Sequence, residues 1–251
     1  MSTKTSQRGR FALGDSVVFT DTVAKAAKDD IVHYPSAGVP KGVGRGVVVG
    51  ARTLFDYGAS LETEYGEYGA YLGSWWNIGP CAGTARRAWL VSYNTRRKPV
   101  LVLDEHLEAA APDVANAPPG KQRFALGEPV SFSGTVAKDW EYDGEDGGDG
   151  KIVWTEQDLP GDYRKRDAPP YSTGIIVGAR TLTDYEFRTE PFAGDPLIEG
   201  ALLSRPDVTR PVSIKGTARR AWLVSFNLYR KPVLVLDEQV SALEQTVGVA
   251  A

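Results

Sequence analysis

The groups in this sequence best suited to nucleophilic catalysis are one cysteine, Cys81, and two histidines, His33 and His106. An imidazole can activate a thiol to attack a carbonyl carbon, and the two side chains need to be adjacent only in space. Cys81 lies in a Gly-Pro-Cys-Ala-Gly stretch, which is more typical of a loop cysteine without a catalytic role. We assign no catalytic residue and predict that the protein is not an enzyme, with a hydrolase-type enzyme as the second alternative.

Carboxylates are the other groups that could act in catalysis or hold a metal ion. Asp104-Glu105 and Asp237-Glu238 are adjacent pairs, but neighbouring residues on a strand point to opposite faces and do not form a catalytic dyad. We expect these pairs to end the last strand of each copy or to contact nearby basic residues. The acidic stretch at residues 143–149 departs from the EF-hand pattern, and one cysteine with two histidines offers few zinc ligands. The sequence thus predicts no metal and no cofactor.

A basic cluster is present twice in the chain and could bind phosphate or an acidic partner, because arginine matches oxyanions with paired hydrogen bonds. Its residues are Arg86, Arg87, Arg97 and Lys98, and their repeats Arg219, Arg220, Arg230 and Lys231. In a hairpin they would flank the two strands and come close together, with Arg52 and Arg180 nearby. The plainer interpretation pairs the arginines with Asp104, Asp237 and similar acids.

The charge balance gives little support to a nucleic-acid partner. The chain has 29 Lys and Arg against 32 Asp and Glu, a net charge of −3. Residues 10–108 are neutral overall and residues 121–244 carry a net charge of −4, whereas nucleic-acid modules usually have a basic excess across the domain. A nucleic-acid-binding module that uses the duplicated cluster is accordingly the first alternative and not the main prediction.

An aromatic segment at residues 64–80 is the best candidate for a partner-binding site. Five aromatic residues lie within it: Tyr65, Tyr68, Tyr71, Trp75 and Trp76. Tyrosine and tryptophan beside glycine and serine are typical of recognition surfaces, because stiff amphipathic rings bury area at little entropic cost. The alternative is a loop folded over the core of the domain. The matching stretch of the second half lacks this density of rings, so the two halves should differ in their partner contacts.

These candidate residues belong to a duplicated chain. Residues 10–14 (RFALG) recur at 123–127, and residues 83–92 (GTARRAWLVS) recur at 216–225. The offset between the copies grows along the chain, which places insertions of 15 and then 5 residues in the second copy. Inserted backbone is usually surface loop, while the matched blocks are scaffold. We therefore predict four parts: a first repeat at 8–108, a Pro/Ala-rich linker at 109–120, a second repeat at 121–244 with an acidic loop insertion, and a tail at 245–251.

The matched blocks have the pattern of β-strands. Residues 88–93 alternate so that Trp89, Val91 and Tyr93 share one face, and an apolar run follows at residues 100–103. Alternation with aromatic and β-branched residues favours strands, and the two segments together predict a hairpin. We expect about five strands and one or two long loops in each copy, and units of this kind form small barrels or sandwiches.

The order of the glycine turns and apolar strands carries a family resemblance. The residues concerned are Gly14, Asp15, Val17, Gly46, Val48, Leu90, Val91 and Leu107. This order resembles the small SH3-like (KOW-like) barrels and covers most of both copies. The resemblance implies an all-β fold of two duplicated SH3-like small barrels with long loop insertions, and two small β-sandwiches are the alternative. A duplicated β-domain without a catalytic signature also looks like a bacteriophage accessory protein.

These observations predict a non-enzymatic binding or structural protein that uses tandem β-barrels to contact a protein partner, as a phage accessory or virion-associated protein. The first residues are polar, and no apolar run approaches the roughly 20 residues that span a bilayer. We therefore expect no membrane partner and a cytoplasmic location, which means the host cytoplasm or the virion if the protein is phage-encoded. The sequence does not define an oligomeric state.

Overall fold

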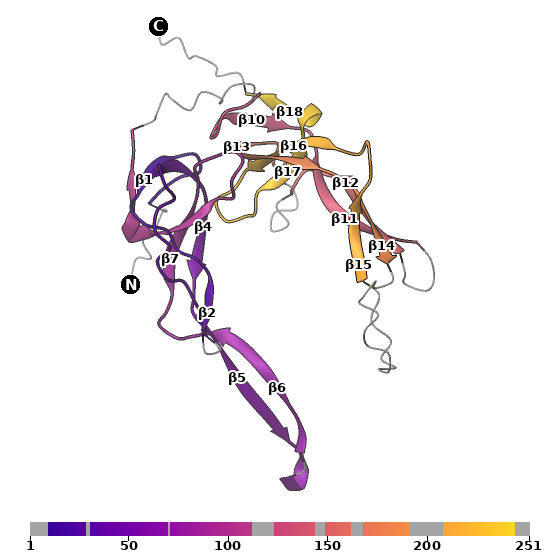
Figure 1. Cartoon of the computed structure of the whole chain (residues 1–251). Coiled ribbons are helices and arrows are strands. Elements are labelled where there is room, and N and C mark those ends of the chain that lie inside the picture. The colour runs from indigo at the N-terminus through magenta and orange to yellow at the C-terminus, as the bar shows by residue number, and fades with distance from the viewer. Residues whose placement is uncertain are drawn as a thin grey trace, which may run out of the picture. The chain divides into compact units, whose positions relative to one another are not determined.

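The computed structural model is an all-β protein, which confirms the predicted fold class (Figure 1). It describes residues 10–28, 31–69, 71–111, 123–143, 149–161, 168–190 and 208–243. The helices in these residues are single 3-10 turns, so none of them approaches the length and apolarity of a bilayer-spanning helix. The linker at 112–120, the acidic residues 144–148 and the tail from 244 lie outside the described residues.

The structure forms two compact units, and each is described by itself. Unit 1 spans Met1–Pro129, which includes the start of the second copy, together with two further segments of that copy, Gly174–Gly178 and Ser225–Pro232. Unit 2 contains the rest of the second copy. The domain boundaries expected from the repeat remain predictions.

The scaffold of the first copy is a five-stranded antiparallel sheet in the order β8-β7-β4-β1-β9. Its strands are β1 (Ser16–Phe19), β4 (Arg45–Leu54), β7 (Arg86–Ser92), β8 (Val100–Leu103) and β9 (Leu107–Ala109). The predicted hairpin is confirmed, because β7 pairs with β8 from Ala88↔Leu103 to Val91↔Val100. Trp89 and Val91 are fully buried, as the alternation predicts. Ala88 and Ser92 are buried as well, so β7 is covered on both faces.

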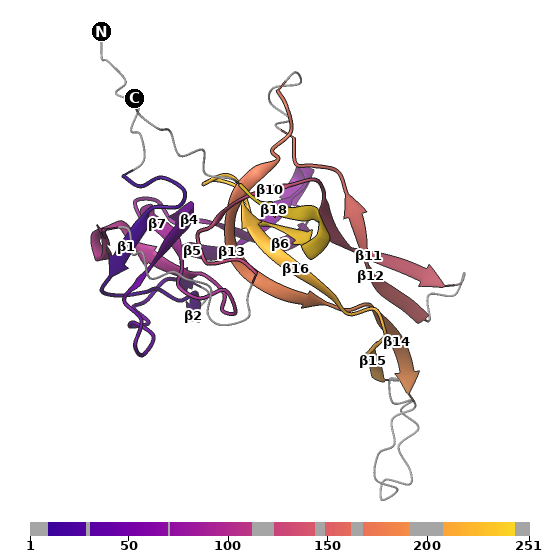
Figure 2. The ribbon, with the colours of Figure 1, turned by 90° about the horizontal axis from the view of Figure 1, so that it is seen from above.

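The second copy repeats this scaffold as β17-β16-β13-β10-β18, in which β10 lies beside β13 and β18 (Figure 2). Its strands are β10 (Pro129–Phe132), β13 (Thr173–Leu182), β16 (Arg219–Ser225), β17 (Val233–Leu236) and β18 (Val240–Ala242). In both copies the described ladders are open, and none closes into a barrel. The SH3-like barrels and the sandwich alternative therefore stay predictions within the confirmed all-β class.

Each copy also has four further strands, which corrects the expectation of about five strands and long loops. In the first copy they are β2 (Ala26–Lys28), β3 (Ile31–His33), β5 (Tyr57–Tyr65) and β6 (Tyr71–Pro80). In the second they are β11 (Thr135–Asp143), β12 (Asp149–Gln157), β14 (Tyr185–Glu190) and β15 (Val208–Ser213). The 15-residue insertion lengthens the β11–β12 hairpin relative to β2–β3, so it extends a ladder and is not wholly surface loop.

A buried tryptophan anchors the scaffold of the first copy. The Trp89 indole Nε1 donates a hydrogen bond of 2.6 Å to Asp104 Oδ1, and the Arg87 guanidinium lies 4.6 Å from the ring centroid. Phe11 meets the same ring edge-on at 5.2 Å. Arg10 Nη1 donates to the Asp104 carbonyl at 2.6 Å and lies 3.5 Å from its carboxylate. Asp104 therefore satisfies the only polar group of a ring that is shielded from water.

The second copy builds the same anchor in unit 2. Trp222 Nε1 donates to Asp237 Oδ1 at 2.5 Å, and Arg220 lies 4.6 Å from the ring centroid. Asp104 begins a 3-10 turn, η2 (Asp104–His106), directly after β8, and Asp237 begins η3 (Asp237–Gln239) directly after β17. Asp104-Glu105 and Asp237-Glu238 thus directly follow a strand, but it is not the last one of the copy, because β9 and β18 come after these turns.

Removal of the Asp104 carboxylate should destabilise unit 1. Asp104→Ala leaves the buried indole N–H without its acceptor, so we expect a loss of about 1–3 kcal/mol in the free energy of unfolding, measured by urea denaturation. Asp104→Asn keeps an acceptor oxygen and should recover much of this loss. Glu105→Ala changes an exposed neighbour and serves as the control. Equal stability of the Asp104→Ala and Glu105→Ala variants would contradict the anchoring role.

Candidate functional site

The sequence-predicted aromatic segment forms a long two-stranded ribbon in unit 1. We call β5, η1 (Glu67–Gly69) and β6 the aromatic arm. Its strands pair from Tyr57↔Pro80 to Glu64↔Gly73. The neighbouring strand β3 pairs with β5 only at Tyr57 and Gly58. From residue 59 onward the arm continues as two strands alone, and Figure 1 shows it extending beyond β2 and β4.

One face of the arm is apolar and open to solvent. Residues opposite each other in an antiparallel pair share a face, and so do residues two apart on one strand. Leu61 pairs with Trp76, and Ala59 pairs with Ile78, so these four side chains form one stripe. The exposed fractions are 54% for Leu61, 61% for Trp76 and 69% for Ile78. Contiguous exposed apolar patches are typical of interaction sites, so the stripe is a candidate binding surface.

The opposite face of the arm is polar. It carries Ser60, Glu62 and Glu64, and the Asn77 side-chain amide donates to Glu62 Oε1 at 2.7 Å. Trp75 pairs with Glu62 in the register, although its side chain lies outside the described set. Residues 57–80 contain three glutamates and neither lysine nor arginine. The arm is therefore an amphipathic ribbon with an acidic side.

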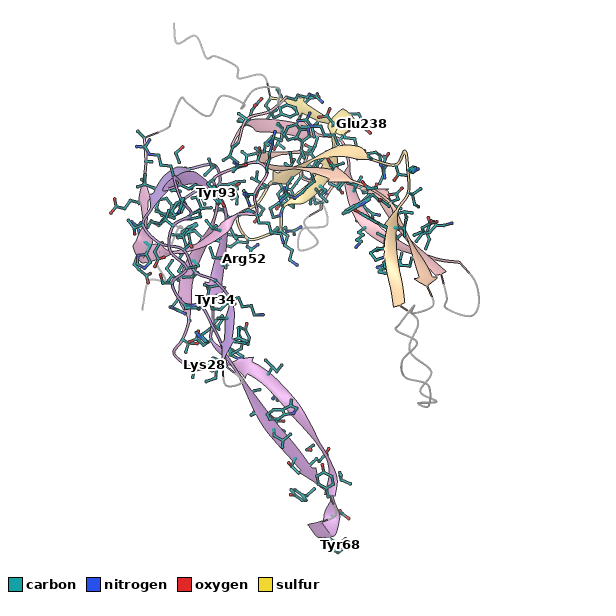
Figure 3. The ribbon with its side chains drawn as sticks, viewed as in Figure 1. Lys28, Tyr34, Arg52, Tyr68, Tyr93 and Glu238 are labelled. Atoms are coloured by element: carbon teal, nitrogen blue, oxygen red, sulfur yellow. The ribbon has the colours of Figure 1, made fainter. Side chains whose placement is uncertain are left out.

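The tip of the arm displays tyrosines. Tyr65 and Tyr71 meet edge to face at 6.1 Å between ring centroids, and both are more than 60% exposed. Tyr68 is fully exposed at the end of the arm (Figure 3). Its backbone has φ 66° and ψ 19°, the left-handed region that non-glycine residues rarely adopt. The fold thus presents this ring outward at a conformational cost.

These exposures bear on the alternative in which the aromatic segment covers the core. Tyr65, Tyr68, Tyr71 and Trp76 lie in solvent, so the alternative of a loop that covers the core is wrong for them. The site also includes apolar residues that sequence reasoning missed: Leu61, Leu72 and Ile78. The alternation of apolar and polar residues in 57–65 is the signal that would have found Leu61.

The corresponding region of the second copy has a different surface. There β14 pairs with β15 along its length and with β12 only at Tyr185 and Glu186, much as β5 pairs with β3 at two residues. Trp140 on β11 stacks against Phe187 on β14, with ring centroids 5.0 Å apart and planes 14° apart. Two aromatic rings of this region therefore pair with each other. The expectation that the two copies differ in their partner contacts remains a prediction.

The duplicated basic cluster does not assemble as expected. Arg86 and Arg87 begin β7, whereas Arg97 and Lys98 lie in the turn beyond its other end. The five residue steps from Arg87 to Ser92 span roughly 17 Å along a strand, so the two basic pairs lie at opposite ends of the hairpin. The nucleic-acid function that this cluster suggested remains a prediction.

The arginine partners also differ from those expected. Arg86 lies 3.4 Å from Asp56, and Arg219 lies 3.9 Å from Asp184. Asp104 and Asp237 instead accept the indole hydrogen bonds of the anchor. The plainer interpretation, in which the repeated arginines pair with acids, therefore holds for Arg86 and Arg219, with Asp56 and Asp184 as partners in place of Asp104 and Asp237.

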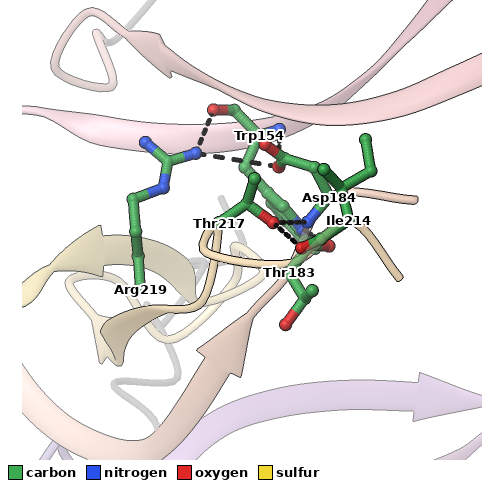
Figure 4. A network of polar contacts seen from close by, with 6 residues as sticks. All are labelled: Trp154, Thr183, Asp184, Ile214, Thr217 and Arg219. Atoms are coloured by element: carbon green, nitrogen blue, oxygen red, sulfur yellow. Dashed lines mark hydrogen bonds and ion pairs between the residues drawn. The ribbon is translucent and has the colours of Figure 1, made fainter. Parts of the chain in front are cut away.

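In unit 2 the Arg219 contact belongs to a network at the start of β14 (Figure 4). Arg219 donates to the Trp154 carbonyl at 2.6 Å, and the Trp154 backbone N–H donates to Asp184 at 3.1 Å. Thr217 Oγ1 accepts from the Asp184 N–H at 3.0 Å and donates to the Ile214 carbonyl at 2.9 Å. This network ties the turn before β16 to the end of β13.

Unit 1 repeats the turn with Cys81 at the place of Ile214. Thr84 Oγ1 accepts from the Asp56 N–H at 3.0 Å and donates to the Cys81 carbonyl at 2.8 Å. The position therefore uses its backbone, and isoleucine serves equally in the other copy. Within the described part of the chain, Cys81 has no hydrogen bond to His33 or His106, and no group of three or more His, Cys, Asp or Glu is placed to hold a metal ion.

Comparison of the chain with protein-family models, with curated protein sequences and with solved structures finds no match.

A carboxylate turn holds the loop between β3 and β4. The Ser36 hydroxyl donates to Asp21 at 2.6 Å, and this hydrogen bond is the largest cause that lowers the pKa of Asp21. Desolvation acts in the opposite direction, and the backbone N–H groups of Thr22 and Gly38 and the charge of His106 lower the pKa further. The ionised carboxylate thereby fixes the chain that leads from β3 into β4.

The Asp21 turn should respond to acid in a defined direction. Because the folded pKa lies below the unfolded value, its stabilising effect is complete above the unfolded pKa and is lost as the pH falls through the folded pKa. Ser36→Ala should raise the Asp21 pKa, measured by NMR titration of the carboxyl carbon. Ser60→Ala, at an exposed serine of β5, should leave it unchanged. An unshifted Asp21 pKa in Ser36→Ala would contradict the role of the Ser36 hydroxyl in lowering that pKa.

Relief of the left-handed backbone at the arm tip should stabilise the arm locally. Tyr68→Gly removes a conformational penalty of about 1 kcal/mol, so amide hydrogens of β5 and β6 should exchange more slowly. Tyr68→Ala removes the ring and keeps the penalty, and it is the matched control. If both variants exchange alike, the tip is not strained.

Proposed function

We propose that the chain is a non-enzymatic binding protein whose aromatic arm docks into an apolar cleft of a partner protein. The observation that carries this proposal is the stripe of Leu61, Trp76 and Ile78, which is open to solvent on the part of the ribbon beyond the two residues of β5 that pair with β3. Burial of a large apolar side chain contributes about 1.5–3 kcal/mol. Tryptophan and tyrosine are also the side chains most often found at binding hot spots.

Charge defines the partner further. The arm carries Glu62, Glu64 and Glu67 without a basic residue, so its polar edges repel phosphate backbones and anionic lipid surfaces. The complementary surface is an apolar cleft with lysine or arginine at its rim, since opposite charges at a rim steer association and fix register. This reasoning favours a protein over a nucleic acid as the occupant of the arm.

The arm also has a shape suited to insertion. A ribbon of two strands enters a cleft that a wider sheet cannot, and Tyr68 at its end reaches furthest from the scaffold (Figure 3). Isolated hairpins are only marginally stable in water. Contact with a cleft would therefore order the arm while it buries the apolar stripe. The role of a phage accessory or virion-associated protein remains part of this proposal, and the identity of the partner will test it.

Loss of the stripe should abolish partner binding without unfolding the chain. The variant Leu61→Ser/Trp76→Ser removes two exposed side chains, so the melting temperature should hardly change. A partner captured by the immobilised wild-type chain, then purified, should bind this variant at least tenfold more weakly in calorimetry. Trp140→Ser, at an exposed tryptophan of the second copy, is the matched control.

Charge reversal separates the proposed partner from other occupants. Glu62→Lys/Glu64→Lys should weaken binding of the same partner at low salt and less so at high salt.

Unchanged binding of the purified partner by the stripe variant would overturn the proposal. So would stripe-dependent self-association in sedimentation experiments, or stripe-dependent binding to neutral lipid vesicles, because either result would identify a different occupant.

A further inference from the structure

A basic pocket lies in unit 1, separate from the stripe of the arm. Its volume is about 360 Å³, and its lining consists of Ala51, Arg52, Thr53, Ala85, Arg86, Arg87 and Tyr229. The residues come from the end of β4, the start of β7 and the turn after β16, and all of them belong to unit 1. Figure 3 labels Arg52 among the side chains of this unit. Volumes of this order are typical of small-molecule sites.

The pocket gathers three guanidinium groups, and its described lining contains no carboxylate. Arg52 Nη1 donates to the Ala51 carbonyl at 2.7 Å. Arg86 lies 3.4 Å from Asp56, which neutralises it only partly, and Arg87 lies over the Trp89 ring. Each guanidinium has five N–H donors, and the described contacts use few of them. The pocket therefore offers fixed positive charge and spare donors, the chemistry that binds a phosphate group.

Tyr229 supplies an aromatic wall to the same pocket. It is 68% exposed, so its ring is available to a ligand. The turn that carries it is held in unit 1 by two hydrogen bonds: the Ala51 N–H donates to the Leu228 carbonyl at 2.6 Å, and the buried Ser225 hydroxyl donates to the Val49 carbonyl at 2.8 Å. The Tyr229 N–H also donates to Asn227 Oδ1 at 2.8 Å. An aromatic face beside a phosphate site is suited to stack a nucleobase.

We propose that this pocket binds a nucleotide, with the phosphate on Arg52, Arg86 and Arg87 and the base against Tyr229. The site is independent of the aromatic arm and of a protein partner. The same chemistry is offered by a free nucleotide and by a nucleotide within a single strand, and the probes below distinguish these two sources. The tyrosine belongs to one copy alone, since the repeat places Arg96 at the position that matches Tyr229.

The repeat provides a matched pair of variants for the test. Arg87→Ala and Arg220→Ala each remove an arginine that covers a buried tryptophan at 4.6 Å, so their structural losses should be similar. Only Arg87 lines the pocket. We expect Arg87→Ala to weaken the binding of ADP with a fluorescent ribose label at least tenfold at low salt, and Arg220→Ala to leave it within twofold of the wild type.

Tyr229 gives a second variant that should not affect folding, because its side chain is mostly exposed. Tyr229→Ala should weaken labelled ADP several-fold and leave the affinity for inorganic phosphate, measured by competition, unchanged. The stripe variant Leu61→Ser/Trp76→Ser should bind labelled ADP as the wild type does, which keeps failure of this site distinct from failure of the arm.

A fluorescent oligothymidylate identifies the source of the nucleotide. Tight binding of this strand, with displacement of labelled ADP, would assign the site to single-stranded nucleic acid. Binding of labelled ADP without the strand would assign it to a free nucleotide. The proposal is overturned if neither probe binds at low salt, or if Arg87→Ala and Arg220→Ala have equal effects on binding.

Discussion

The fold depends on how a fully buried indole satisfies its single N–H group. Trp89 lies at the centre of the first core, and its Nε1 has an acceptor only because Asp104 follows β8 directly. That requirement fixes where β8 ends, where η2 turns, and where β9 returns to pair with β1. An unpaired buried donor costs about 1–3 kcal/mol, a large share of the stability of a small domain. The second copy repeats the same solution with Trp222 and Asp237.

Both candidate sites in unit 1 follow from this fixed scaffold. The arginine that lies over the indole, Arg87, is the second residue of β7 and lines the basic pocket, so the anchor also orients a guanidinium of the proposed nucleotide site. The aromatic arm leaves the scaffold where Asp56 meets Arg86 and the Thr84 turn, between the end of β4 and the start of β5. A rigid base allows a two-stranded ribbon to expose apolar side chains that its own unit does not bury.

The repeated blocks made the strands of the scaffold predictable. The arm depends on the pairing of β5 with β6, and the ion pairs depend on contacts between residues distant in the chain, and neither shows as a pattern in the sequence. Alternation around Trp89 and Val91 identified the β7–β8 hairpin, because a two-residue period follows directly from burial. The strands of the arm escaped notice because β6 carries Leu72, Trp76 and Ile78 among glycines without strict alternation. Arg86 contacts Asp56, which lies 30 residues before it in the chain. The sequence-based interpretation instead named Asp104 as a partner, an acid that lies closer to Arg86 in the sequence. The separation of Arg97 from Arg87 follows from strand length and could have been predicted.

Net charge was the wrong scale for choosing a partner. The whole chain carries −3, yet unit 1 combines an arm whose charged residues are all glutamates with a pocket that holds three arginines. Glu62 lies five residues beyond the start of β5, roughly 16 Å along the strand, about twice the screening length at physiological salt. The acidic arm therefore does not neutralise the pocket beside its base. The proposed protein partner and the proposed nucleotide therefore face surfaces of opposite charge within a protein of nearly neutral total charge.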